Sequence, residues 1–147
     1  MPPLTQRPTP PPASLVGIGD ALRLSLSFAP DPRRVAYARR VAGELVRLRG
    51  LSEDTVHTVE LLVSEIVTNA VVHGRGGRVR FLFAYDEDGD VRIEVDDRAH
   101  ARVEVGAPDS EEENGRGLFL VASLARAWGR RGTRTWCTVP TGGVSSP

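Results

Sequence analysis

The sequence predicts an α+β fold: a two-layer sandwich in which one mixed, mostly antiparallel sheet carries helices on one face. Residues 22–28, 78–85 and 90–97 alternate apolar and polar side chains, which is typical of half-buried strands. Between the first and second of these strands, two long segments repeat apolar residues at helical spacing. The second and third strands follow one another directly across a turn at residues 86–89, as in an antiparallel hairpin. This hairpin argues against a doubly wound parallel sheet, in which a helix would separate the two strands.

Capping residues mark both ends of the two predicted helices. Asp31 and Pro32 begin the first helix, because Asp accepts an N–H of the first turn and Pro needs no donor at the first helical position. This helix is expected to run to Arg49 and to be closed by Gly50. Ser52 caps the second helix, which Gly74 ends.

The rest of the predicted domain is a loop, a helix and a strand. Residues 98–114 have no apolar period and contain Gly, Pro and an acidic run, so they are predicted to form a long loop. Residues 118–128 predict a third helix, and residues 133–139 predict a final strand.

Composition narrows the class of protein. The domain is expected at residues 21–140, between a proline-rich tail at residues 1–20 and a short tail at residues 141–147, both predicted to be disordered. Lys and Arg number 19, as do Asp and Glu, so no global charge attracts nucleic acid or a membrane surface. Cys137 is the one cysteine and is expected to be a buried structural thiol. With no apolar run that predicts a bilayer span and no secretion signal, we expect a cytoplasmic protein.

A row of polar residues marks the second predicted helix. Glu65, Asn69 and His73 follow at intervals of four, and each fourth residue advances only about 40° around a helix. The three side chains therefore form one slanted row at the border of the apolar face. Such a row indicates either a functional site or a half-buried helix with incidental polar residues at its edge. His73 alone is either a phosphate contact or a histidine favoured by the helix dipole.

Asp97 is expected to point toward the helices, at the end of the apolar row formed by Val91, Ile93 and Val95. A buried carboxylate needs a hydrogen-bond donor, and the exocyclic amino group of adenine is one such donor. The alternative is an Asp that has already left the sheet and caps the following loop through its backbone.

Two glycines, Gly115 and Gly117, precede the third predicted helix, which begins at Leu118. Backbone N–H groups at such a helix start approach anions closely, and the helix dipole adds partial positive charge. Arg116 between the glycines can donate to phosphate oxygens. The segment matches neither the P-loop nor the dinucleotide-binding fingerprint.

Together, in order and spacing, these three segments resemble the N, G1 and G2 boxes of the Bergerat-fold (GHKL) ATPases, over residues 22–140. Within that superfamily the chain looks like the anti-sigma-factor serine/threonine protein kinases. The resemblance implies ATP and Mg²⁺ as cofactors. It assigns Asn69 as the Mg²⁺ ligand, Glu65 as the general base that polarises the attacking hydroxyl, and Asp97 as the acceptor of the adenine amino group.

The resemblance also implies the remaining nucleotide contacts. Phosphates would be held by Gly115, Arg116, Gly117 and Leu118 beneath a lid formed by residues 98–114, and Thr135 is a candidate for closing the adenine pocket. The chain departs from the family pattern at the first glycine box, where Ala99 and Ala101 replace the usual glycines.

The expected function is therefore that of an anti-sigma factor that binds Mg²⁺-ATP and phosphorylates a Ser or Thr of an anti-anti-sigma antagonist. Its expected partners are a sigma factor and that antagonist, with no direct contact to nucleic acid or membrane, and a homodimer is open because such relatives are often dimers. The alternative is a non-catalytic module with a degenerate ATP site, which binds nucleotide without chemistry or binds proteins alone.

Overall fold

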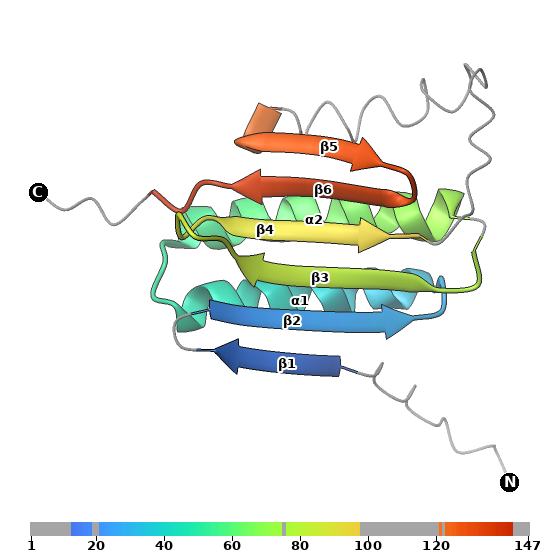
Figure 1. Ribbon diagram of the computed structural model, residues 1–147, viewed down its shortest axis with the longest axis horizontal. Coiled ribbons are helices and arrows are strands. Elements are labelled where there is room, and N and C mark those ends of the chain that lie inside the picture. Colours follow the sequence, from blue (N-terminus) through green and yellow to red (C-terminus); the bar gives the residue numbers. More distant parts are fainter. Residues whose placement is uncertain (1–12, 19–20, 75, 98–120, 122, 143–147) are drawn as a thin grey trace, which may run out of the picture.

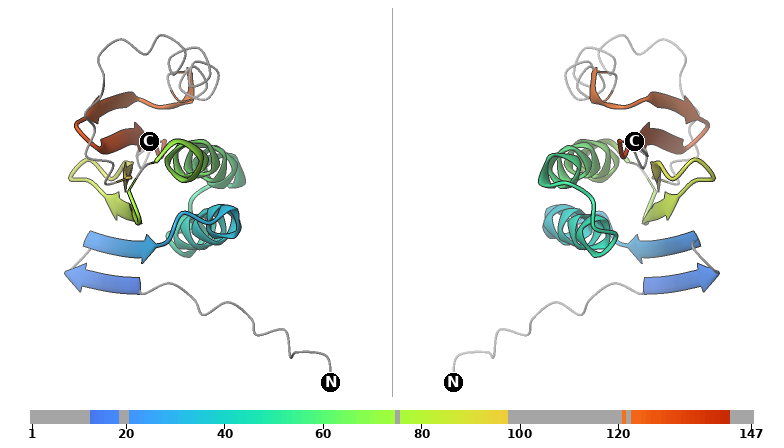
Figure 2. Two further views of the ribbon diagram at one scale, coloured as in Figure 1. Left: turned by 90° about the vertical axis from the view of Figure 1, so that its right-hand side faces the viewer. Right: turned by 90° about the vertical axis from the view of Figure 1, so that its left-hand side faces the viewer.

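A computed structural model describes residues 13–18, 21–74, 76–97, 121 and 123–142 (Figure 1). They form a six-stranded sheet with the strand order β1-β2-β3-β4-β6-β5. Figure 2 shows that both long helices lie on the same side of the sheet. The predicted α+β sandwich is confirmed. The sequence predicted a mixed, mostly antiparallel sheet, and each of the five ladders between described strands is antiparallel.

Alternating side chains account for three of the strands, β2, β3 and β4, and glycine turns connect the strands of two hairpins. Gly89 adopts a positive φ of 83° in the predicted turn, where the Asp86 carboxylate accepts the N–H groups of Asp88 and Asp90. Gly132 adopts a φ of 59° in a second turn. The bounds are β1 (Ala13–Ile18), β2 (Ala21–Phe28), β3 (Val79–Tyr85), β4 (Val91–Asp96), β5 (Ala127–Arg131) and β6 (Arg134–Val139).

The two helices begin and end close to the predicted residues. Helix α1 spans Pro32–Leu48, and the Asp31 side chain accepts the N–H of Arg33 at 2.9 Å. Hydrogen bonds from Arg33 lower the pKa of Asp31. Helix α2 spans Glu53–His73, with Ser52 as its N-cap and Gly74 as its C-cap. The capping prediction is confirmed at all four ends, since Arg49 is the C-cap of α1 and Gly50 follows it with a φ of 76°, the left-handed conformation that closes a helix.

Three predictions about element bounds are wrong. Strand β1 lies inside the predicted N-terminal tail and pairs with β2 along its whole length, because the backbone groups at the edge of β2 offer it a ladder. Thr141, placed in the C-terminal tail, is held to Gly89 and Asp90 by hydrogen bonds of 3.1 and 3.4 Å. The third helix, predicted to reach residue 128, has ended by Ala125, because the chain from Ala127 pairs with β6 instead.

The core lies between the helices and the inner face of the sheet. Alternate residues of β3 and β4 are buried against the helices, in the patterns that the sequence predicts. Helix α2 is long and apolar enough to cross a bilayer by length and composition. Its packing in the core accounts for that composition, since seven of its residues are buried: Val56, Val59, Leu62, Val63, Ile66, Val67 and Ala70.

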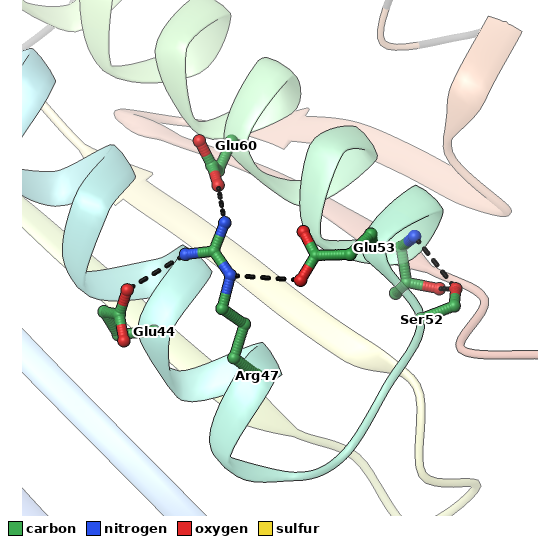
Figure 3. Close-up of polar contacts among 6 residues, drawn as sticks. Glu44, Arg47, Ser52, Glu53 and Glu60 are labelled. Atoms are coloured by element: carbon green, nitrogen blue, oxygen red, sulfur yellow. Dashed lines mark hydrogen bonds and ion pairs between the residues drawn. The ribbon is translucent and has the colours of Figure 1, made fainter.

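An arginine joins the two helices at the C-terminal end of α1 (Figure 3). Arg47 lies 2.9 Å from Glu44, 3.3 Å from Glu53 and 3.5 Å from Glu60. The hydrogen bond to Glu53 is the main reason that the pKa of Arg47 is raised. A Cβ at Gly43 would lie 2.7 Å from Glu60 Oε1, so the Glu60 side chain would have to shift to accommodate it. These ion pairs connect the end of α1 to the first half of α2.

Candidate functional site

The polar row of α2 lies where the sequence predicts it. Glu65 and Asn69 are half-buried, and His73 is exposed at the last residue of the helix. Their neighbours Ile66 and Ala70 are buried in the core. Within the described part of the chain, neither the Glu65 carboxylate nor the Asn69 amide takes part in a side-chain hydrogen bond or ion pair. Both groups are therefore available to a ligand at the rim of the core.

The end of α2 meets the end of β4 at Gly74. Gly74 donates its N–H to the Ala70 carbonyl at 2.9 Å. A Cβ placed on Gly74 would lie 3.2 Å from the Cβ of Asp97. The structure thus brings the polar row and Asp97 to one end of the sandwich, although they are separated in the sequence by all of β3 and β4.

Asp97 points inward, as the strand parity predicts. It is only 6% exposed and follows directly after β4, with its N–H donating to the Thr133 carbonyl at 3.1 Å. Its carboxylate accepts a hydrogen bond from Arg130 Nη2 at 3.3 Å. A buried carboxylate requires such a donor, so the Asp97 side chain does more than cap the following loop.

Thr135 shares the face of Asp97. It pairs with Val95 across the β4–β6 ladder, and cross-strand partners point to the same side of a sheet. Its hydroxyl accepts a hydrogen bond from Arg130 Nη1 at 3.4 Å. One guanidinium therefore contacts both residues that the sequence had assigned to the adenine pocket.

Arg130 is the site residue that the sequence did not predict. It lies on β5, a strand that was assigned in part to the third helix. The turn glycine Gly132, between residues 127–131 and 134–139, is the signal that could have located it, because a glycine between two short segments is typical of a hairpin.

The predicted phosphate contacts lie outside the described residues. They comprise Gly115, Arg116, Gly117 and Leu118, and the predicted lid and the substitutions Ala99 and Ala101 lie outside as well. Their roles stay predictions from the sequence.

A magnesium ion fits the described donors only when phosphate oxygens complete its coordination. Among the residues that the structure describes, no group of three His, Cys, Asp or Glu side chains converges on a point. Mg²⁺ keeps several waters and needs only one or two protein oxygens beside substrate phosphates. The half-buried Asn69 amide, one helical turn from Glu65, supplies one such oxygen.

Two surface hollows of the described structure lie elsewhere. One, of about 170 Å³, opens on the helix-free face of the sheet between Arg23, Arg80 and Arg134. The other, of about 220 Å³, lies between the start of α2 and Pro140. Glu65, Asn69 and Asp97 line neither of them.

Cys137 is a structural thiol, as predicted. It is fully buried, and burial raises its pKa from 9.0 to about 12. Because the thiolate is the reactive form, this thiol takes no part in nucleophilic chemistry near pH 7.

We expect Cys137 to resist alkylation in the native protein. At pH 8 its thiolate fraction is about a thousandfold below that of an unfolded cysteine, given a pKa of about 12 rather than 9.0. Maleimide labelling followed by mass spectrometry, with and without denaturant, measures the ratio of the two rates. Equal rates would show that the thiol is accessible and ionised in the folded chain.

The comparison with protein families agrees with this arrangement. The profile described as Histidine kinase-like ATPase domain matches residues 28–139, which is more than half of the chain. The match spans α1, α2 and every strand from β3 to β6. No curated protein matches the chain closely enough to serve as a relative.

Proposed function

The chain belongs to the histidine kinase-like ATPase family, and we propose that it is an anti-sigma-type protein kinase. The GHKL (Bergerat-fold) domains of this family bind ATP, usually with Mg²⁺, and the family includes anti-sigma factor kinases. In this role the chain binds Mg²⁺-ATP, sequesters a sigma factor and phosphorylates a Ser or Thr of an anti-anti-sigma antagonist. A cytoplasmic location and contacts to proteins rather than to nucleic acid or membrane are part of the same proposal.

One observation carries this proposal: the polar row of α2 runs toward Gly74, where an added Cβ would lie 3.2 Å from the Cβ of Asp97. In the proposal, the Asp97 carboxylate binds the base, and the Asn69 amide and Glu65 carboxylate follow on the phosphate side along α2. This is the order in which adenine, phosphates and an attacking hydroxyl follow one another in a kinase complex with ATP.

The proposed roles follow from the chemistry of each group. Phosphoryl transfer depends on positioning and charge neutralisation more than on covalent catalysis. The Glu65 carboxylate takes the proton of the attacking Ser or Thr hydroxyl while the new O–P bond forms and the bond from Pγ to the ADP oxygen breaks. Asn69 offers its amide oxygen to Mg²⁺, which when bound offsets negative charge on the phosphates. Asp97 accepts the adenine amino group and fixes the base.

The second candidate function is a regulatory module without kinase activity. Ala99 and Ala101, in place of two glycines of the family pattern, favour it, because an added Cβ limits how closely backbone can approach phosphate. In this case nucleotide either sets the conformation of a protein-binding surface or is not bound at all.

Nucleotide titration tests the proposal directly. We expect Asn69→Ala to weaken binding of Mg²⁺-ATP by at least about tenfold and to leave the weaker metal-free binding nearly unchanged, because the variant removes a metal ligand. Isothermal titration with ATP and ADP, with Mg²⁺ or EDTA, measures both affinities. Thr68→Ala is the matched control, since Thr68 is the preceding, exposed residue of α2. An Asn69 variant that keeps the full Mg²⁺ dependence would contradict the assignment.

A transfer assay separates the two candidate functions. The chain is incubated with γ-³²P-ATP, Mg²⁺ and a panel of anti-anti-sigma domains, and label on Ser or Thr is located by mass spectrometry. Transfer supports the kinase. Tight nucleotide binding without transfer to any antagonist favours the regulatory module, and absence of binding leaves only a protein-interaction function.

A further inference from the structure

We infer that Arg130 gates the adenine pocket by competing with the amino group of the base for Asp97. This inference rests on the proposed nucleotide site and adds a residue that sets its affinity. The contacts are Arg130 Nη2 to Asp97 Oδ2 at 3.3 Å and Arg130 Nη1 to Thr135 Oγ1 at 3.4 Å. The guanidinium thus contacts two acceptors that a purine base would need.

The sheet register places Arg130 on the inner face. Arg130 pairs with Thr135, and Thr135 pairs with Val95, which is buried against the helices. Paired residues of adjacent strands point to the same side, so Arg130 extends toward the pocket while its neighbour Arg131, paired with Arg134, points to the other face. Only one of two consecutive arginines can therefore reach Asp97.

Burial makes the contact asymmetric. The Asp97 side chain is 9% exposed, whereas the Arg130 side chain is 47% exposed. A half-exposed guanidinium can turn into water at little cost, whereas a buried carboxylate oxygen that loses a donor favours a replacement. The donor that replaces Arg130 is then the exocyclic amino group of adenine.

The bond lengths suit a displaceable contact. Distances of 3.3 and 3.4 Å lie beyond the usual range of about 2.7–2.9 Å for a charge-assisted hydrogen bond. Arg130 therefore holds Asp97 through a long contact, and its removal should improve nucleotide binding rather than prevent it.

The test compares Arg130→Gln with Arg131→Gln, a matched control that removes the neighbouring arginine on the opposite face. Isothermal titration with Mg²⁺-ATP is paired with Mg²⁺-ITP, whose base carries an oxo group in place of the amino donor. We expect Arg130→Gln to bind ATP about three- to fivefold more tightly than the parent chain, and ITP no more tightly. Loss of a positive charge alone would weaken the binding of both nucleotides, because both are polyanions.

A second variant and a stability measurement show whether a change in affinity results from misfolding. Arg130→Met removes the charge and keeps most of the length of the side chain, and circular dichroism melts of all the variants report whether the fold is intact. The gate predicts tighter ATP binding in both Arg130 variants.

Each other outcome counts against the gate. Equal ATP affinity in the parent and both Arg130 variants overturns the gate and leaves the proposed function standing. Weaker ATP binding shows that Arg130 contacts the nucleotide. An equal gain for ATP and ITP shows that the amino group is not the competing donor. Absence of nucleotide binding in every protein overturns the gate and the proposed function together.

Discussion

Replacement of Glu65 by Gln is expected to reduce phosphoryl transfer by about 10²- to 10⁴-fold, the usual contribution of a general base. The amide keeps the size of the side chain but cannot take the proton of the attacking hydroxyl. Glu65 is half-buried, and within the described residues its carboxylate is bound to no other side chain. The substitution therefore breaks no internal contact of the described structure. ATP affinity should stay within about twofold, because the base acts on the attacking group.

The control for this experiment is Glu60→Gln. Glu60 lies on the same helix but binds Arg47 at 3.5 Å, at the α1–α2 contact. Its replacement should leave the transfer rate unchanged. The comparison requires single-turnover measurements with a phosphorylatable antagonist. Transfer at the parental rate in the Glu65 variant would exclude Glu65 as the base.

Replacement of Gly74 by Ala is expected to destabilise the fold by about 1–3 kcal/mol, the usual cost of forcing an extra methyl into a packed position. The added Cβ would overlap the Ala70 carbonyl oxygen and lie 3.2 Å from the Asp97 Cβ. Helix α2 must then give up its final hydrogen bond or shift away from β4. Either movement displaces His73 and Asp97, so nucleotide affinity should fall together with stability.

Gly77→Ala is the matched control for Gly74→Ala. Gly77 lies in the same connection between α2 and β3, and a Cβ there would meet no atom within 4 Å. Urea titration of both variants should show a change confined to Gly74→Ala. A Gly74 variant as stable as the parent, with unaltered ATP affinity, would show that the close approach of α2 and β4 is not required.

Much of the fold could be predicted because local signals agree with the tertiary structure. Asp31 and Ser52 are caps whose side chains accept first-turn N–H groups, and each marks its helix within one residue. Strand parity gave the inward direction of Asp97, since burial in β4 alternates without a break. Strand β1 gave no comparable signal, because its existence depends on the exposed edge of β2.

The candidate site could be predicted in part for the same reason. Helical spacing aligns Glu65, Asn69 and His73 without any tertiary information. The contact of Arg130 with Asp97 depends instead on two ladders, β4–β6 and β6–β5. The register of these two ladders cannot be obtained from alternation alone. Ala127 and Trp128 are apolar and continue the pattern of the predicted third helix, so the start of β5 was assigned to that helix.

The pairing of β2 with β3 has a consequence for the folding kinetics of the chain. Phe28 and Val79 are partners in this ladder, although both helices lie between them in the sequence. Closing so long a loop costs chain entropy before any strand contact repays it. Early formation of the helical hairpin shortens the loop, so substitutions at Arg47 or Gly43 should slow refolding more than they accelerate unfolding.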